Sequence, residues 1–427
     1  MVTNQIKSRG LPAALRFAWK AAGHSTDGSR LFYAWMFVLT AVALVGVNAW
    51  AKQMVDGMAV TGMSDHVSWG LYVANFTFLV GLAAGGVMMV IPAYLYRDEA
   101  MHEVVIIGEI LAVAAVVMAL LFVNVDIGRL DRLWHLTPGF GRLNWPMSML
   151  TWDILVLGTY LLLSLYIATY LVYTRFLGRE PDPRRYVPFV LLSIVWAISI
   201  HTVTAFLYCG IGGRTFWNSA LMAPRFLASA FVAGPAFVVL TLQVVQRLRL
   251  FDVPEAAIGT LLRIMKVTVV LNLFLLFCEL FTEFYTGGHH STAVTYLFFG
   301  SHGHSELVPW IWTAVALNGG AAAVLLIRPL SERRALLNVA LVATFVGIWI
   351  EKGMGLIIPG FVPSTLGELV PYSPSLTEWK VTAGIWAFGL MLFTVAVKLA
   401  LQTVGGTLRL STAPSSHGDS DDEEGEG

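Results

Sequence analysis

Cysteine is almost absent from this 427-residue chain, which contains only Cys209 and Cys278. Two thiols can build neither a disulfide framework nor a four-cysteine iron–sulfur cluster. Charged residues are also scarce, at 13% of the chain, and they balance to a formal net charge of zero. A neutral chain has no general basic surface for nucleic acid. The sequence therefore predicts no cluster of its own and no nucleic-acid partner.

Apolar residues are abundant instead, at 57% of the chain, and the mean hydropathy is +0.71. An ordinary soluble domain could not carry this composition without a large exposed apolar surface. A helix needs about 20 apolar residues to cross a bilayer. The sequence predicts an all-α membrane protein with ten spanning helices, at roughly 31–53, 69–94, 103–125, 148–174, 187–209, 221–246, 258–284, 306–327, 335–358 and 379–402.

Arginine and lysine are divided unevenly between the loops. The segment before the first span is basic, and loops of the same parity carry most of the remaining arginines, whereas the loops after the seventh and ninth spans have no lysine or arginine. Positive loops stay on the cytoplasmic side. We expect a multi-pass protein of a prokaryotic inner membrane, with both termini in the cytoplasm.

The chain divides into three parts by composition. Residues 1–30 form a basic cytoplasmic segment, residues 31–402 form the transmembrane domain, and residues 403–427 form an acidic cytoplasmic tail that is expected to be disordered. Within the membrane, 69–209 and 221–358 are predicted to form two four-helix bundles, flanked by one helix at each end.

The loop after the third predicted span is dense in polar residues on the side where positive charge is unusual. Two interpretations are open. The loop either forms a surface for a partner or ligand, or it is folded by internal clamps that join Asp126 to Arg129 and Asp131 to Arg132. His135 belongs to the same loop, and Asp153 follows at the start of the next span.

His201 lies in an apolar helix, where its imidazole could donate a hydrogen bond and pass a proton, or simply bind a neighbouring helix. Other polar and aromatic residues are expected at similar depth. Together they suit a quinone, which needs an aromatic slot, donors for its carbonyl oxygens and a carboxylate to relay protons. A haem is less favoured, because only one intramembrane histidine is clear. The set comprises Trp69, Tyr72, Asn75, Asp153, His201 and Tyr208.

Carboxylates inside predicted helices form a second set, because charge within a membrane is costly and usually functional. Glu279 and Glu283 are four residues apart and share one helix face. With Glu109 and Glu351 they could form a proton path, or they could serve as structural glue, with Glu351 paired to Arg225.

Histidines cluster after the seventh predicted span. Their spacing lacks a tight metal-binding pattern, so a docking loop is the simpler interpretation and no metal site is predicted. The residues are His289, His290, His302, His304 and Glu306.

Several segments carry a family resemblance. They are Trp69-Gly-Leu-Tyr-Val-Ala-Asn75 with Gly81-Leu-Ala-Ala-Gly-Gly86, Asp126-Ile-Gly-Arg129 with Trp134-His135, and Arg214 with Trp217-Asn218. These segments resemble the NrfD/PsrC family of quinone-interacting membrane subunits. The segments Glu279-Leu-Phe-Thr-Glu283 and Ile350-Glu-Lys-Gly-Met-Gly are similar to the ten-helix branch that includes DsrP, HmeC, QrcD and HybB.

The resemblance implies a haem-free subunit of a respiratory quinone oxidoreductase complex. Such a subunit would bind menaquinone or ubiquinone near the outer face and exchange electrons with a docked ferredoxin-like iron–sulfur protein, with a multihaem cytochrome as a further partner and proton translocation as a further activity. The implied catalytic residues are His135, Asp153 and His201. The implied quinone-binding residues are Trp69, Tyr72, Asn75, Arg129, His135, Asp153, His201 and Tyr208. Which residue bonds which quinone carbonyl stays open.

Two other functions remain open at this point. A secondary transporter or ion channel would account for the charge near the membrane midplane, although the sequence shows no obvious pair of broken helices. A pure membrane anchor for redox subunits would need no quinone-sized cavity beside His201.

Overall fold

The computed structural model describes residues 12–137, 139–287, 291–364 and 367–410, and it is built of helices. Ten spans are long and apolar enough to cross a membrane, so the predicted all-α membrane fold with ten spans is confirmed. The spans are α3 (Arg30–Asp56), α4–α5–η2 (Leu71–Leu95), α6 (Glu99–Asp126), α7 (Met149–Phe176), α8 (Pro183–Cys209), α9 (Met222–Arg247), α10 (Glu255–Thr286), α12 (Val308–Leu326), α14–α15–η5 (Arg334–Phe361) and α16 (Leu376–Val404).

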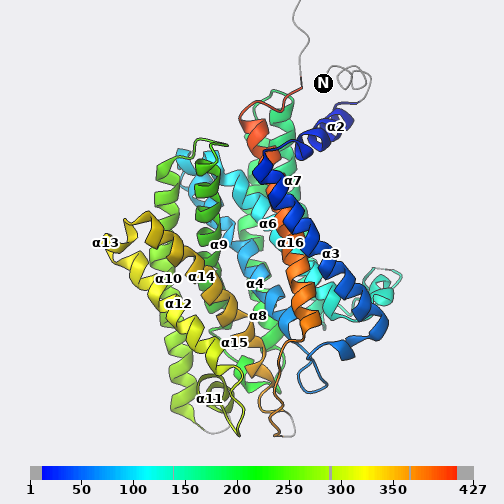
Figure 1. Cartoon of the computed structure of the whole chain (residues 1–427), viewed down its shortest axis with the longest axis vertical. Coiled ribbons are helices and arrows are strands. Elements are labelled where there is room, and N and C mark those ends of the chain that lie inside the picture. The colour runs from blue at the N-terminus through cyan, green and yellow to red at the C-terminus, as the bar shows by residue number, and fades with distance from the viewer. Residues whose placement is uncertain (1–11, 138, 288–290, 365–366, 411–427) are drawn as a thin grey trace, which may run out of the picture.

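Short helices lie outside the spans. They are α2 (Ala13–Thr26), η1 (Met58–Val60), η3 (Leu130–Leu136), η4 (Thr215–Trp217), α11 (Ser291–Phe299) and α13 (Arg328–Ser331). The helix α2 and the end of α16 lie at one end of the bundle (Figure 1). We call this the predicted cytoplasmic end, and the opposite end the predicted outer end. Residues 1–11 of the predicted basic segment and residues 411–427 of the predicted acidic tail lie outside the described residues.

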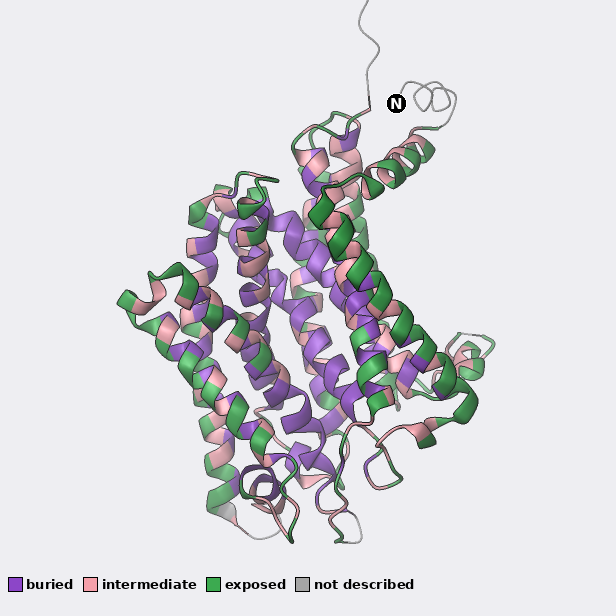
Figure 2. Cartoon of the chain, viewed as in Figure 1, coloured by how far each residue is buried: buried purple, intermediate pink, exposed green. Residues whose placement is uncertain are grey.

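The helix α4 (Leu71–Gly85) is the centre of the fold. It contacts α6, α8, α9, α14 (Arg334–Lys352) and α16. Within the most apolar 18-residue stretch of each span, 78% of the residues are buried in α4–α5–η2 and in α6, but only 11% are buried in α3. Figure 2 shows the buried residues gathered on the central helices and the exposed ones on the periphery. An apolar exposed face is what lipid requires of a peripheral helix.

Close approach of α4 and α9 depends on glycine. A Cβ added to Gly85 would lie 2.5 Å from the Cα of Gly234, so neither position has room for a side chain. Gly85 thus faces a helix of the other predicted bundle, as small residues at helix interfaces in membranes do. The division into two four-helix bundles stays a prediction.

Two spans are interrupted, although the sequence shows no obvious pair of broken helices. After Gly86 the second span continues as α5 (Val87–Val90) and the π-helical turn η2 (Ile91–Leu95). After Lys352 the ninth span breaks at Gly353 and continues as α15 (Met354–Ile357) and η5 (Pro359–Phe361). A Cβ on Gly353 would lie 2.6 Å from the carbonyl oxygen of Trp349, so the break requires glycine.

Candidate functional site

One face of α8 carries three of the polar residues near the predicted outer end. His201, Thr204 and Tyr208 stand at i, i+3 and i+7, which places them in one stripe along the helix. All three are buried, at 1% exposure or less. The stripe brings the predicted residues His201 and Tyr208 together, and Thr204 links them to a carboxyl group.

That carboxyl group belongs to Asp153, in the first turns of α7. The hydroxyl of Thr204 donates to Asp153 Oδ1 at 2.7 Å, and the Asp153 side chain is buried, with 2% of the residue exposed. Asp153 forms no ion pair with any described residue. A carboxyl group buried without a cation is costly to maintain and typically serves function.

An aromatic layer covers the predicted outer end of this stripe. Trp69 packs edge-on against Tyr208, with ring centroids 5.7 Å apart, and stacks on Trp217 at 5.6 Å. The Tyr208 hydroxyl forms a hydrogen bond with Thr77 of α4. The indole of Trp217 donates to the carbonyl of Leu356 at 2.9 Å. Trp69 and Tyr208 are therefore brought together as the sequence predicts, within one aromatic layer.

Asn75 and Tyr72 point away from the stripe, although they lie on the neighbouring α4. Asn75 Oδ1 accepts from the indoles of Trp349 at 3.0 Å and Trp386 at 2.8 Å. The Tyr72 hydroxyl donates to Gln53 Oε1 on α3 at 2.7 Å. These bonds tie α4 to three other helices, so both residues hold the scaffold in this structure.

His135 and Arg129 lie on an exposed loop at the predicted outer end rather than in the buried stripe. The His135 ring stacks on Trp134 with centroids 3.8 Å apart. Arg129 Nε donates to Asp131 at 2.9 Å, and this hydrogen bond lowers the pKa of the exposed Asp131 carboxyl. The predicted clamp of Arg129 with Asp126 is wrong, because Arg129 turns to Asp131 on an exposed turn whereas Asp126 is half-buried at the end of α6.

A buried ion network joins four helices of the second predicted bundle. Arg225 of α9 pairs with Glu279 of α10, and its second nitrogen lies 3.0 Å from Glu351 of α14. Glu351 also contacts Lys352 Nζ at 3.3 Å and accepts from Asn318 of α12 at 2.8 Å. Two cations thus face two carboxylates, and the network is formally neutral. The pairing of Glu351 with Arg225, one of the two predicted interpretations, is present.

The two remaining predicted carboxylates occupy other positions. Glu109 of α6 is 3% exposed and forms no ion pair among the described residues. Glu283 is buried one turn beyond Glu279 toward the predicted outer end. Charge compensation therefore separates Glu279 and Glu351, which are paired, from Glu109 and Asp153, which pair with no cation in the described part of the chain.

A small cavity lies beside His201, between α4, α8, α9 and α14. It holds about 10 Å³, roughly one water, and is lined by His201, Thr77, Ser229 and Lys352 among others. The Nδ1 atom of His201 is buried without a hydrogen-bond partner among the described residues, so the predicted bond to a neighbouring helix is not formed by this atom. The cavity is too small for a quinone ring as it stands.

The histidine loop shows no metal-binding geometry in the described part of the chain, where no group of three potential ligands converges. His304 Nδ1 lies 3.1 Å from Glu306 Oε1, and the His302 ring bonds its neighbour Ser301. Burial raises the pKa of Tyr296 in α11 to about 12. His289 and His290 lie outside the described residues.

Several buried polar residues in and around the site were not predicted from the sequence. Thr77 and Thr204 were missed because threonines in helices commonly bond the preceding turn, as Thr77 also does to the carbonyl of Val73 at 2.9 Å. Asn318 could have been found as an amide in an apolar span. Glu378 was missed at the start of α16, where it accepts from the Tyr372 hydroxyl at 2.6 Å; burial and this carboxylate raise the pKa of Tyr372.

Comparison with known proteins agrees with the membrane fold. The chain is 26% identical over 405 residues to a protein assigned as a membrane subunit of dimethyl sulfoxide reductase in Halobacterium salinarum, covering 85% of this chain and 90% of the relative. It is 23% identical over 406 residues to a selenate reductase subunit of Mesobacillus selenatarsenatis, covering 85% and 92%. It is 25% identical over 389 residues to an Hdr-like menaquinol oxidoreductase integral membrane subunit of Archaeoglobus fulgidus, covering 86% and 93%.

The family model described as "Polysulphide reductase, NrfD" matches residues 59–363, which include the spans from the second to the ninth and the buried residues His201, Asp153 and Arg225. More than half of the chain is matched, as the resemblance in its motifs predicts. The chain belongs to the NrfD family.

Proposed function

We propose that this protein is the membrane subunit of a respiratory redox complex and that it exchanges protons with a quinone at Asp153, near the predicted outer end. The observation that carries the proposal is that some buried carboxylates pair with a cation and others do not. Glu279 and Glu351 are neutralised by cations, whereas Asp153 has a hydroxyl partner, Thr204, and no cation among the described residues. A carboxyl group in this setting can carry a proton to or from a bound molecule.

The quinone would approach Asp153 from the lipid between α7 and α8. Both helices are peripheral, and apolar side chains near Asp153 and Thr204 are exposed, including Leu150 and Leu155 at 43% and Phe206 at 48%. A route from lipid avoids the small cavity beside His201. The bound quinone would supply two-electron chemistry accompanied by two protons. Thr204 orients the carboxyl group that holds one of these protons, and Tyr208 and Trp69 close the outer side of the site.

The electron partner would be an iron–sulfur protein docked on the predicted outer loops. Support comes from the loop around η3, where Trp134, Phe140 and Met147 are 55%, 81% and 82% exposed beside the Arg129–Asp131 pair. An aromatic surface with arginine is typical of protein interfaces. The relatives named as reductase subunits and as a menaquinol oxidoreductase subunit support a complex of this kind.

A second candidate, a pure anchor for redox subunits, is favoured by the roughly 10 Å³ cavity beside His201. The transporter alternative receives less support. The spans interrupted at Gly86 and Gly353 are the second and ninth, which do not occupy corresponding positions in the two predicted bundles, as paired broken helices in transporters do.

The test is quinone-linked turnover of the assembled complex carrying Asp153→Asn. The amide keeps the shape and can accept from Thr204, but it cannot carry a proton. We expect turnover to fall at least about 100-fold. Transfer from the partner to an artificial water-soluble dye should remain, because that reaction bypasses the quinone. Asp252→Asn, on an exposed loop at the predicted cytoplasmic end, is the matched control.

An anchor would behave differently in the same assay. Unchanged quinone-linked turnover in Asp153→Asn would overturn the proposed site, provided that size-exclusion chromatography shows an intact complex. Thr204→Val serves as a second probe, since it removes only the hydroxyl that orients Asp153. We expect an intermediate loss in that variant.

A further inference from the structure

A second cavity lies at the predicted cytoplasmic end, far along the helices from Asp153. Its volume is about 540 Å³, within the usual range for ligand sites. The cavity is bounded by the start of α6, the end of α7, the start of α8 and the end of α16. None of the functions considered above uses it.

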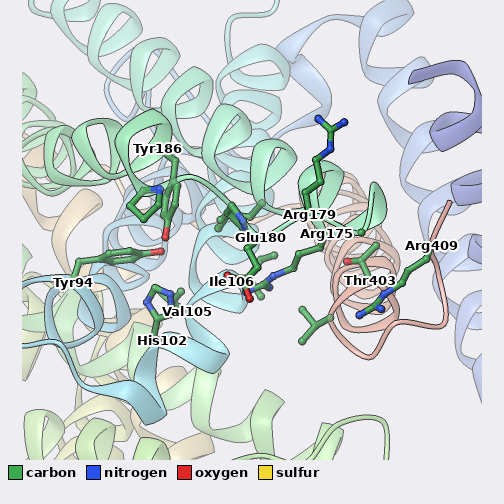
Figure 3. A pocket seen from close by; sticks show the side chains of 15 residues that line it. Tyr94, His102, Val105, Ile106, Arg175, Arg179, Glu180, Tyr186, Thr403 and Arg409 are labelled. Carbon is green, nitrogen blue, oxygen red and sulfur yellow. The ribbon is translucent and has the colours of Figure 1, made fainter. Parts of the chain in front are cut away.

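Positive charge predominates in this cavity. Arg175, Arg179 and Arg409 line it, against a single carboxylate, Glu180. None of the three arginines forms an ion pair within the described ranges of the chain. Figure 3 shows Arg175 reaching into the middle of the cavity and Arg409 approaching from the opposite wall beside Thr403. Arginines arranged in this way suit a phosphate-type anion.

The cavity is held in shape by contacts from both ends of the chain. The backbone N–H of Leu410 donates to the carbonyl of Phe176 at 2.8 Å, which fixes the segment after α16 against the end of α7. Lys20 of α2 donates to the carbonyl of Arg409 at 2.9 Å. The charged residues are therefore positioned by the fold rather than free on a loop.

The remaining walls suit a lipid more than a free anion. Val105, Ile106 and Leu171 provide an apolar wall. Arg175 belongs to the last turn of a spanning helix, at the depth where phospholipid headgroups lie. On the other side Tyr94 and Tyr186 point their hydroxyl groups toward one another, with ring centroids 5.9 Å apart (Figure 3). Basic pockets between helices at this face bind anionic headgroups.

We propose that this cavity binds the phosphodiester headgroup of an anionic phospholipid. Arg175 and Arg409 hold the phosphate from opposite walls, and the apolar wall receives the upper part of an acyl chain. The site is separate from the proposed quinone site, and it would seat the predicted cytoplasmic end of α7 and α16 on the membrane.

Native mass spectrometry of the full chain in detergent tests the proposal, with phosphatidylglycerol and phosphatidylcholine as probes. We expect the wild-type protein to retain one phosphatidylglycerol in preference to phosphatidylcholine. Binding should weaken roughly fivefold in Arg409→Gln and roughly 25-fold in Arg175→Gln/Arg409→Gln. Arg247→Gln removes an exposed arginine at the same end, outside the cavity, and should change nothing.

Three results would overturn the proposal. Equal retention of both lipids by the wild type would show that charge is not recognised. Equal retention of phosphatidylglycerol by Arg409→Gln and the wild type would show that the cavity is not the site, and this exposed residue can be changed without disturbing a spanning helix. Binding of millimolar inorganic phosphate without binding of phosphatidylglycerol would assign the cavity to a free anion.

Discussion

Replacing Arg225 by an uncharged residue would leave two buried carboxylates, Glu279 and Glu351, with one cation, Lys352. In Arg225→Met the long apolar side chain keeps most of the volume but none of the charge. Glu351 would still contact Lys352 and Asn318, whereas Glu279 would lose its ion-pair partner. The perturbation therefore tests whether the network is held together by charge compensation.

The magnitude follows from burial. The side chains of Arg225 and Glu279 are 8% and 6% exposed, and removing one partner of such a pair costs about 3–5 kcal/mol. The pair of Arg328 and Glu332 offers a control on the same protein, because its side chains are 87% and 63% exposed. Arg328→Met should cost about 0.5 kcal/mol or less. The expected difference in unfolding free energy between Arg225→Met and Arg328→Met is therefore large enough to distinguish a buried pair from an exposed one.

The assay is equilibrium unfolding in mixed micelles, followed by tryptophan fluorescence. We compare the wild type with Arg225→Met, Arg328→Met and the double variant Arg225→Met/Glu279→Gln. The double variant restores formal neutrality, so we expect it to recover at least about 1 kcal/mol of the loss. The reasoning would be refuted if Arg225→Met cost no more than Arg328→Met, or if the double variant were less stable than Arg225→Met.

The remaining predictions concern the scaffold around the site. Gly85→Ala places a Cβ 2.5 Å from the Cα of Gly234 and should cost about 1–3 kcal/mol in the same unfolding assay, whereas Gly158→Ala, which meets nothing within 4 Å, should be neutral or stabilising; equal effects would contradict the close contact. Asn75→Ala leaves two indole N–H groups without their acceptor and should cost about 1–3 kcal/mol while partial quinone-linked turnover survives; complete loss of turnover in a stable protein would instead place Asn75 at the quinone. Tyr372→Phe removes the 2.6 Å bond to Glu378 in the first turn of α16 and should speed proteolysis of the loops at the predicted outer end without changing dye-linked electron transfer; unchanged proteolysis would show that this bond does not hold the loops.

The spans could be predicted from sequence because hydropathy over about 20 residues is a local property. All ten were found, and even the interrupted region Arg334–Phe361 was predicted to within a few residues. The break at Gly353 was missed, since a glycine inside an apolar run has no distinct local signature. The helix α4 approaches closely at this point, where a Cβ on Gly353 would lie 3.2 Å from the Cβ of Ala74, and only the tertiary structure reveals that approach.

The site was predicted in part. His201 and Tyr208 share a helix face, so their proximity follows from spacing alone. Asn75 was assigned to the same site by depth, but depth does not fix direction, and its side chain turns to Trp349 and Trp386. The direction of a side chain is set by its hydrogen-bond partners on other helices. Those partners cannot be identified from the sequence of one segment. Its predicted role in quinone binding stays a prediction.

Photoaffinity labelling of the assembled complex with a photoreactive menaquinone analogue tests the central claim most directly. We expect peptide mapping to place the label around Asp153 and Thr204, in the parts of α7 and α8 nearest the predicted outer end. Excess unlabelled menaquinone should prevent the labelling. Label confined to the cavity around Arg175 at the other end, or to α10 and α12, would contradict the proposed quinone site.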